Sequence, residues 1–307
     1  MNSSTIFLEF LLFPGLLFTA AAGLLTSWVD RKVTAMVQMR VGPPFLQPFY
    51  DLRKYFIKET CVPEGGAIGL FLVAPLIGFA GVTLASMILW RSLLNVEATF
   101  VGDLIVLVYL LMMPALGVVL GAFSSRNPLA SIGGSREIKL MIAYELPLVL
   151  VVLVPVVQAD SIRLGDLVTS TPVASLSGIL ALLAGIACMQ AKLTIVPFDA
   201  PEAETELSGG VFIEYSGPPL GVYKLTRAMM LFTMPVFLVA LFFGGIATAP
   251  GVVPKLWGLL AWFVLVALTV VLRNTTPRVR TDQAVKFFWG PVTVVALLAV
   301  VLAWFGY

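Results

Sequence analysis

The sequence predicts an all-α polytopic membrane protein that forms a single membrane domain over residues 1–307, with eight transmembrane helices and one amphipathic helix at the membrane surface. Three observations lead to this prediction. Hydrophobic residues make up 59% of the chain and charged residues only 12%, whereas a soluble domain carries about 25% charged residues. Long uncharged stretches recur along the whole chain. Lys and Arg gather in alternate connections between these stretches.

The eight predicted spans follow from the lengths of the apolar stretches, because a helix needs about 20 mostly apolar residues to cross the hydrocarbon core. Seven stretches are free of charge, and the fourth contains a single acid, Glu145. In chain order the predicted spans are Phe10–Val29, Gly65–Trp90, Leu104–Ser125, Leu140–Ala159, Leu167–Ala191, Ala228–Pro254, Leu256–Leu272 and Phe287–Tyr307.

Lys and Arg set the predicted orientation, since cytoplasmic connections are enriched in these residues. The connections after spans 1, 3, 5 and 7 share one side, and they carry sixteen of the nineteen basic residues. The opposite side has only Arg91, Arg163 and Lys255. We therefore expect a protein of the prokaryotic cell membrane with both termini outside. Residues 1–5 show neither a basic region nor a cleavage pattern, so we expect no removable signal peptide and a permanent first span.

The first connection is long enough to hold a helix of its own. Apolar residues fall on one face of this helix and charged residues on another, which is typical of a helix lying in the membrane interface. The apolar face comprises Phe45, Phe49, Leu52 and Phe56, and the charged face comprises Asp51, Lys54 and Lys58. Two interpretations stay open: a helix that only contacts lipid, or a lip that partner subunits or a quinone touch.

Several classes of function are excluded by what the chain lacks. It has no histidine, so it offers no His-held haem, no His-based metal site and no His proton relay. Its two cysteines, Cys61 and Cys188, are too few for an iron–sulfur cluster site. The net charge of +2 is too small to indicate nucleic-acid binding. We expect no metal and no cofactor in this chain, and any metals that serve its function belong to partner chains.

The connection between spans 5 and 6 holds the densest group of acids, in the stretch Pro197–Pro219. Five of the seventeen acids fall within sixteen residues, namely Asp199, Glu202, Glu204, Glu206 and Glu214. Crowded like charges raise each other's proton affinity. The group is therefore either a docking face for a partner or a place where protons are held and passed. We also expect a short helix here, capped by Asp199, with Glu202 and Glu206 on one face.

Glu145 is the sharpest single candidate for ion movement, because an acid inside a membrane helix costs about 2.5–3.5 kcal/mol and usually faces a bundle interior or a water path. Pro147 frees a backbone carbonyl close to it. Alternatively, Glu145 lies near the cytoplasmic end and only pairs with a basic neighbour. Lys224 and Arg227 lie one turn apart just inside span 6, ahead of its uncharged stretch, where they either balance the acidic group or act as cytoplasmic anchors.

Three long motifs resemble one family of membrane subunits. They are RVGPPFLQPFYDLRKYFIKE at Arg40–Glu59, GGSREIKLMIAYELP at Gly133–Pro147 and PFDAPEAETELSGGVFIEYSGPP at Pro197–Pro219. The chain resembles the heel subunit of respiratory complex I, also called subunit 1. It looks closer still to the membrane anchor of energy-converting nickel–iron hydrogenases, formate hydrogenlyases and sulfane reductases, since an acid follows Arg136 here as in those proteins.

The resemblance implies a non-catalytic subunit of an oxidoreductase complex. Its partners are a peripheral arm with iron–sulfur clusters, in the hydrogenases also a nickel–iron centre, and antiporter-like membrane subunits. It couples electron transfer, from ferredoxin or formate, to the movement of protons or sodium ions along buried acids. By motif, the coupling residues are Asp51, Glu59, Glu137, Glu145, Glu202, Glu204, Glu206 and Glu214. The charge-balancing residues are Arg40, Arg136, Lys224 and Arg227.

Two other functions remain as alternatives. A quinone-site subunit of true complex I is the first, and a stand-alone secondary transporter is the second. The transporter is disfavoured because the sequence contains no inverted repeat of broken helices. The choice between protons and sodium stays open at this point, because carboxylates serve both ions.

Overall fold

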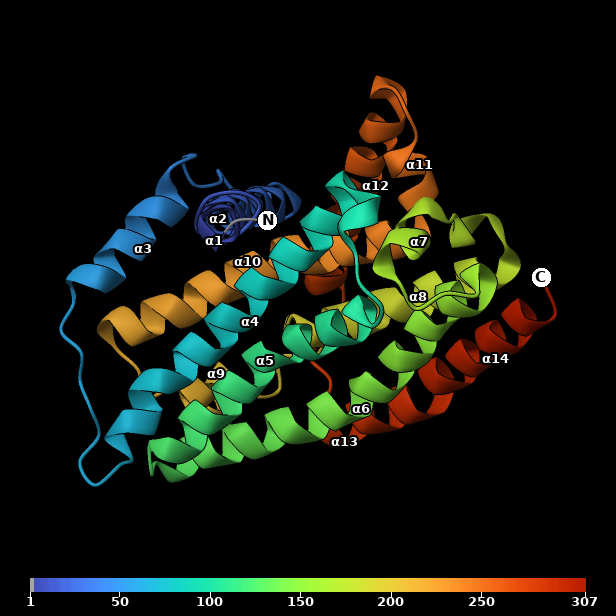
Figure 1. Ribbon diagram of the computed structural model, residues 1–307. Coiled ribbons are helices and arrows are strands. Elements are labelled where there is room, and N and C mark those ends of the chain that lie inside the picture. Colours follow the sequence, from blue (N-terminus) through green and yellow to red (C-terminus); the bar gives the residue numbers. More distant parts are fainter. Residues whose placement is uncertain (1–2) are drawn as a thin grey trace.

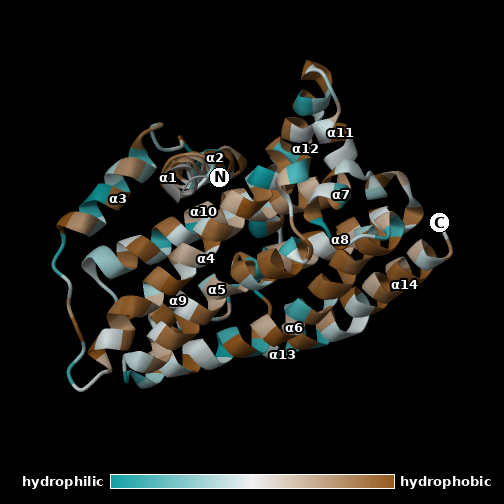
Figure 2. Cartoon of the chain, viewed as in Figure 1, coloured by the Kyte–Doolittle hydropathy of each residue, from teal (hydrophilic) through white to brown (hydrophobic). Residues whose placement is uncertain are grey.

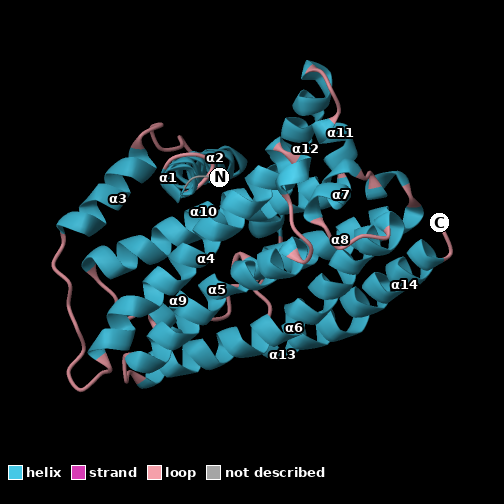
Figure 3. Cartoon of the chain, in the orientation of Figure 1, coloured by secondary structure: helices cyan, strands magenta, loops and turns pink. Residues whose placement is uncertain are grey.

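The computed structural model describes residues 3–307, apart from the side chains of residues 3–6, 204, 205 and 247. The described part of the chain folds entirely into helices and loops (Figure 3). Apolar residues cover most of the long helices, as expected for a membrane bundle (Figure 2). The predicted fold class, an all-α polytopic membrane protein, is confirmed.

The chain begins with α1 (Ser3–Leu11), α2 (Leu16–Val37), α3 (Gln47–Ile57), α4 (Ile68–Leu94), η1 (Val96–Ala98) and α5 (Asp103–Ser124). Its middle part comprises α6 (Pro128–Ala159), α7 (Leu164–Thr169), η2 (Pro172–Ala174), α8 (Leu176–Lys192), α9 (Glu204–Leu207) and η3 (Gly210–Phe212). It ends with α10 (Gly217–Phe242), α11 (Gly244–Thr248), α12 (Val252–Thr275), α13 (Thr281–Phe287), η4 (Phe288–Val292) and α14 (Thr293–Trp304).

Seven segments of the described chain are long and apolar enough to cross a membrane. The remaining predicted span, Leu167–Ala191, is shorter than expected, because its first residues form α7 and η2 and leave 17 residues for α8. The helix of the sixth predicted span, in contrast, begins earlier than expected. This helix, α10, begins at Gly217, eleven residues before the predicted start at Ala228. Lys224 and Arg227 therefore lie within the helix.

Helix α10 forms the centre of the bundle (Figure 1). In its most apolar stretch of 18 residues, 94% of the residues are buried. It packs against α2 and α4. Gly23 of α2 allows this approach, because a Cβ atom there would lie 2.7 Å from the backbone of Ala228 and Met229. On the other side of the bundle, α6 packs against α8, and α14 packs against both. A small residue at a helix contact, such as Gly23 between α2 and α10, is typical of helix packing in membranes.

The non-helical backbone between α7 and α8 is satisfied within the protein. The Ser175 hydroxyl donates to the Pro172 carbonyl at 2.7 Å and accepts from the Gly178 N–H at 3.1 Å. The Gly245 backbone N–H donates to the Ser170 carbonyl at 2.8 Å. Irregular backbone at membrane depth requires partners of this kind, because the hydrocarbon core supplies none.

The predicted amphipathic helix is present as α3, which lies beside α2 and the start of α10 (Figure 1). Phe49 and Leu52 pack against the core, whereas Phe45 and Phe56 are about half exposed. The predicted apolar face is therefore divided between the protein core and the surface. Asp51, on the other face, points back toward the bundle and pairs with Arg31 of α2 at 2.8 Å.

The short helix expected in the acid-rich connection differs from the prediction. Only Glu204–Leu207 is α-helical, and the side chain of Asp199 binds Arg278 rather than capping a helix. Since the helix begins only at Glu204, Glu202 lies outside it, and Glu202 and Glu206 do not share a helical face. They pair with different arginines.

Candidate functional site

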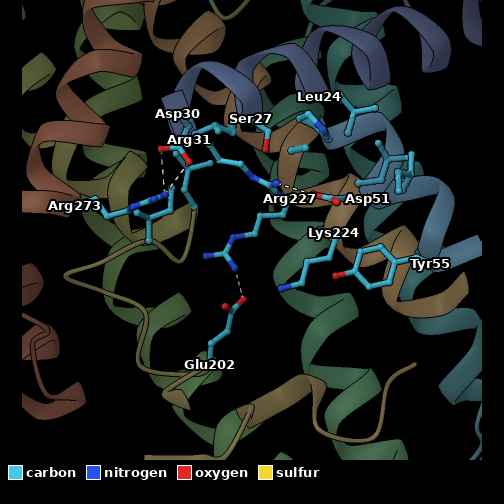
Figure 4. A pocket seen from close by; sticks show the side chains of 17 residues that line it. Leu24, Ser27, Asp30, Arg31, Asp51, Tyr55, Glu202, Lys224, Arg227 and Arg273 are labelled. Atoms are coloured by element: carbon cyan, nitrogen blue, oxygen red, sulfur yellow. Dashed lines mark hydrogen bonds and ion pairs between the residues drawn. The ribbon is translucent and has the colours of Figure 1, made fainter. Parts of the chain in front are cut away.

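A cavity of about 450 Å³ opens at the end of the bundle where α2, α3, α10 and α12 meet the acid-rich connection. Figure 4 shows the basic and acidic side chains of this lining, among which Arg273 reaches Asp30 and Arg227 reaches Glu202. The Arg273–Asp30 pair joins α12 to α2 with N–O distances of 2.8 and 3.1 Å. The cavity is therefore lined by charge at one end of the bundle.

The connections after predicted spans 1, 5 and 7 meet at this cavity, and they contribute Arg31, Asp51, Glu202, Lys224 and Arg273. The sequence assigned these three connections to one side of the membrane, and the structure gathers them at one end of the bundle. That this end faces the cytoplasm stays a prediction from the distribution of Lys and Arg.

Three arginines from separate parts of the fold hold the acid-rich connection against the bundle. Arg278, between α12 and α13, binds Asp199 with two nitrogens at 2.5 and 2.7 Å. Arg227 of α10 binds Glu202, and Arg136 of α6 binds Glu206, each at 2.5 Å. Charge-assisted bonds of this kind are about twice as strong as neutral ones. Glu202 faces inward with about one fifth of its side chain exposed, whereas the side chain of Glu206 is 51% exposed.

The pKa values of the carboxyls in this region follow from their partners. Burial alone would raise the pKa of Glu202, but the charges of Arg227 and Lys224 outweigh it and hold the pKa below its ordinary value. For Asp51 the effect of burial is likewise outweighed, by hydrogen bonds from Arg31 and Gln47, and the pKa is lowered. These carboxyls are therefore ionised at neutral pH, which keeps the cavity charged.

A smaller cavity of about 60 Å³ continues inward from Glu202 and Arg227. Glu137 of α6 and Lys192 of α8 line its far side. Glu137 is buried, and its Oε2 has no hydrogen-bond partner among the described residues. The cavity has room for at least one water, which needs about 10–15 Å³ and two or more polar partners. A water here would bridge polar groups that do not touch directly.

Beyond this small cavity, Lys192 binds Glu145 across the α6–α8 contact, with Nζ and Oε1 2.5 Å apart. The side chain of Lys192 is only 1% exposed, and its ammonium also lies 5.4 Å from the centre of the Tyr144 ring. The sequence left open that Glu145 pairs with a basic neighbour. It does so, but the partner is on another helix rather than on the preceding turns of its own.

The described charged residues thus form a series from the large cavity into the bundle: Glu202 with Arg227, then Glu137, then Lys192 with Glu145. Asp51 and Lys224 line the large cavity at the start of the series. Neighbouring carboxyls joined by water or by a shared cation can exchange protons or attract cations. The arrangement is suited chemically to moving positive charge.

Other predicted residues lie outside this series. Glu59 and Arg40 are exposed on the connections that flank α3 and line neither cavity. Glu214 accepts a hydrogen bond from Asn127 at 2.6 Å. Glu206 and Arg136 bind each other at the surface of the acid-rich connection. The side chain of Glu204 is not among those that the structure describes.

The sequence did not single out Lys192, Asp30 or Arg273 as members of the site. Lys192 was counted only as a basic residue at the end of a span, and Asp30 and Arg273 only as charges that end uncharged stretches. Their partners lie 47 and 243 residues away. The sequence offers one weak indication, that each of these residues is the first charge after a predicted span. It is weak because a side chain at such a position can turn inward to a cavity or outward to lipid headgroups.

A bundle of apolar helices that encloses a series of ion-paired side chains defines an integral membrane protein with a polar interior. The chain belongs to the NADH dehydrogenase family, whose model matches residues 9–304. The family expected from the three motifs is thus confirmed.

Curated relatives and a solved structure agree with this assignment. The chain is 35% identical over 289 residues to a subunit of the NADH-quinone oxidoreductase of Anoxybacillus flavithermus, covering 88% of this chain and 84% of the relative. It is 32% identical to the corresponding subunit of Brevibacillus brevis over 96% of this chain and 92% of the relative. The fold is similar to a chain of the membrane-bound sulfane sulfur reductase, an archaeal respiratory membrane complex, with a TM-score of 0.80, 27% identity, and coverage of 97% and 99%.

Proposed function

We propose that this chain is a non-catalytic membrane subunit of a respiratory complex related to NADH-quinone oxidoreductase, and that it couples electron transfer to ion movement. The observation that carries the proposal is the series of ion-paired and buried carboxyls from the large cavity to Glu145. A carboxyl inside a membrane protein costs free energy, so a set of them indicates a path for ions. The relatives, named as subunits of respiratory complexes, supply the context.

In the proposed mechanism, a redox reaction in a peripheral arm changes the electric field at the large cavity. Glu202 and Asp51 respond first, because they line that cavity. The change reaches Glu137 through the small cavity and then alters the balance between Lys192 and Glu145. The peripheral arm would carry iron–sulfur clusters, and antiporter-like subunits would receive the charge from Glu145. Carboxylates serve protons and sodium equally well, and we propose protons as the first ion to test.

The test replaces Glu145 with Gln in the intact complex. We expect the complex to assemble and to transfer electrons, while ion pumping in sealed vesicles falls at least tenfold, because an amide cannot take up or release a proton. Glu97→Gln is the matched control, since Glu97 is an exposed acid outside both cavities. Normal pumping by the Glu145→Gln complex would remove this carboxyl from the path.

Docking of the peripheral arm is tested at a different acid. Glu206 is half exposed on the acid-rich connection, so a partner can reach it, whereas Glu202 faces inward to Arg227. We expect Glu206→Lys to release the arm during purification and Glu206→Gln to weaken it less, because only the first reverses the charge. An arm that stays bound in Glu206→Lys at 0.5 M salt would show that docking lies elsewhere.

The large cavity favours a quinone site as a second candidate function. Its volume of about 450 Å³ falls in the range of ligand pockets, roughly 300–1,000 Å³. Leu24, Leu225 and Leu231 give it an apolar wall beside the charges. Inhibition by quinone-site compounds, lost in Leu225→Trp, would support this function. A purified complex that contains a nickel–iron centre and no quinone, and that ignores such compounds, would support the hydrogenase-like branch.

A further inference from the structure

A second system of cavities begins at the opposite end of the bundle and reaches Glu145, the last residue of the charged series, from the other side. A pocket of about 720 Å³ is lined by Asp160, Ser161 and Arg163 after α6 and by Trp304 of α14, together with five aliphatic side chains. A groove of about 530 Å³ runs beside it between α5 and α6. The two share Val156 and Ile162 in their linings, so they are continuous.

The groove is apolar along its length. Its lining consists of aliphatic and Met side chains with two exceptions, Tyr109 and Glu145. Glu145 lies eleven residues before Val156 on α6, which corresponds to about 16 Å of helix, and the groove extends one further turn to Met141. Half of the hydrocarbon core of a bilayer is about 15 Å. The groove therefore reaches at least the depth of one leaflet.

The pocket at the outer end of the groove carries both signs of charge. Arg163 is fixed in place, since it donates to the carbonyl and the hydroxyl of Thr99, each at 3.2 Å. Asp160 directly follows α6 with a left-handed backbone (φ 49°), and it enters no ion pair among the described residues. A carboxylate at the C-terminal end of a long helix is unfavourable unless a cation lies nearby, because the helix dipole is negative there.

Trp304 indicates the depth at which the pocket lies in the membrane. It is exposed at the end of α14 and lines the pocket. Trp is enriched at the depth of lipid headgroups, where its ring and its N–H meet apolar and polar surroundings. A pocket with one cation and one anion thus lies beside a Trp that favours headgroup depth, above an apolar groove that reaches at least one leaflet deep.

We propose that this pocket and groove bind a zwitterionic phospholipid that carries a primary ammonium, as in phosphatidylethanolamine. The phosphate binds Arg163, the ammonium binds Asp160, and one acyl chain fills the groove down to Glu145. Charge complementarity excludes a purely anionic head, which would leave Asp160 unpaired beside a second negative group. The part of the proposal that concerns Glu145 rests on the proposed function: the acyl chain shields this carboxyl from the lipid side.

The first test uses the wild-type complex in vesicles that contain phosphatidylethanolamine with a photoreactive group at the end of one acyl chain. We expect labelling of α5 and α6 near Met112 and Met141, the inner end of the groove. Val149→Trp fills the groove from an exposed position and should remove the label, whereas Leu183→Trp, exposed on α8, should not. Labelling elsewhere, or unchanged labelling in Val149→Trp, would overturn the proposal.

The second test addresses the headgroup. Complexes purified from vesicles with equal phosphatidylethanolamine and phosphatidylglycerol are examined by native mass spectrometry. We expect the wild-type complex to retain phosphatidylethanolamine selectively. In Asp160→Asn this preference should fall about tenfold, because one charge-assisted hydrogen bond is lost. Arg163→Gln should lose both lipids, and Lys255→Gln, an exposed control outside both cavities, should lose neither. Equal retention of the two lipids by the wild type would refute the headgroup assignment. Because neither test measures pumping, failure of the proposed function leaves them unaffected.

Discussion

The pair of Lys192 and Glu145 gives the most demanding prediction, because the two side chains should depend on each other for stability. The ammonium of Lys192 is almost completely buried and lies 2.5 Å from the carboxylate. Removing one member of a buried pair costs about 3–5 kcal/mol, since the remaining charge has no compensation. Glu145 is 19% exposed, which reduces the cost on its side. The pair should therefore behave as a unit.

We expect Glu145→Gln, which leaves the fully buried ammonium of Lys192 uncompensated, to lower the free energy of unfolding by about 3 kcal/mol, and Lys192→Met, which leaves the partly exposed Glu145, by about 2 kcal/mol. The double variant should lose only about 2 kcal/mol, because it leaves no uncompensated charge. The coupling energy is then about 3 kcal/mol, at the upper end of values for residues in contact. The measurement is unfolding of the purified chain in detergent micelles by added denaturing detergent, followed by near-UV circular dichroism.

Additivity would refute this reasoning. If the double variant loses about 5 kcal/mol, within the usual error of about 0.5 kcal/mol, the two side chains act independently. A useful control is the pair Arg31 and Asp51, in which the arginine is 44% exposed. Its coupling should not exceed about 1 kcal/mol, because water screens exposed pairs.

The remaining predictions concern packing and charge elsewhere in the chain. Gly23→Ala should destabilise the protein by about 1–3 kcal/mol in thermal unfolding, since the added methyl meets the backbone of α10, whereas Gly69→Ala, with open space around it, should not. Arg273→Met should leave Asp30 unpaired and cost more than the double change of both residues, in the same unfolding assay. Because the pKa of Glu202 is lowered from 4.5, its stabilisation is present above pH 4.5 and is lost as the pH falls through the folded-state pKa; the unfolding free energy of Glu202→Gln should therefore vary less with acid pH than that of the wild type.

The membrane fold could be predicted largely from the sequence, because crossing a bilayer demands uncharged stretches of a set length. The predicted bounds differ from the structure where a helix contains charged residues or is shorter than a full span. The predicted sixth span began at its uncharged stretch, with Ala228, but α10 begins at Gly217, and Lys224 and Arg227 within it line a charged cavity rather than face lipid. Helix α8 begins late because the Ser175 hydroxyl bonds the Pro172 carbonyl and the Gly178 N–H and so satisfies the turn that precedes it.

The acids of the candidate site were also visible, since they are crowded or lie inside a span. Their partners were not. Glu145 binds a lysine 47 residues away, and Asp199 binds an arginine 79 residues away. Pairing of this kind depends on which helices become neighbours, and periodicity in a single sequence does not contain that information. Local spacing also suggested a common helical face for Glu202 and Glu206, which the late start of α9 prevents.

Helix α8 has a consequence for the surrounding bilayer. Its 17 residues extend about 26 Å, a few ångströms less than a typical hydrocarbon thickness of about 30 Å. Its outer surface carries three exposed apolar side chains, Leu176, Ile179 and Leu183. Lipids on this side must compress or tilt to match it, at fractions of a kcal/mol for each ångström of mismatch. Membranes built from shorter acyl chains should consequently accommodate this protein with less strain than membranes built from longer ones.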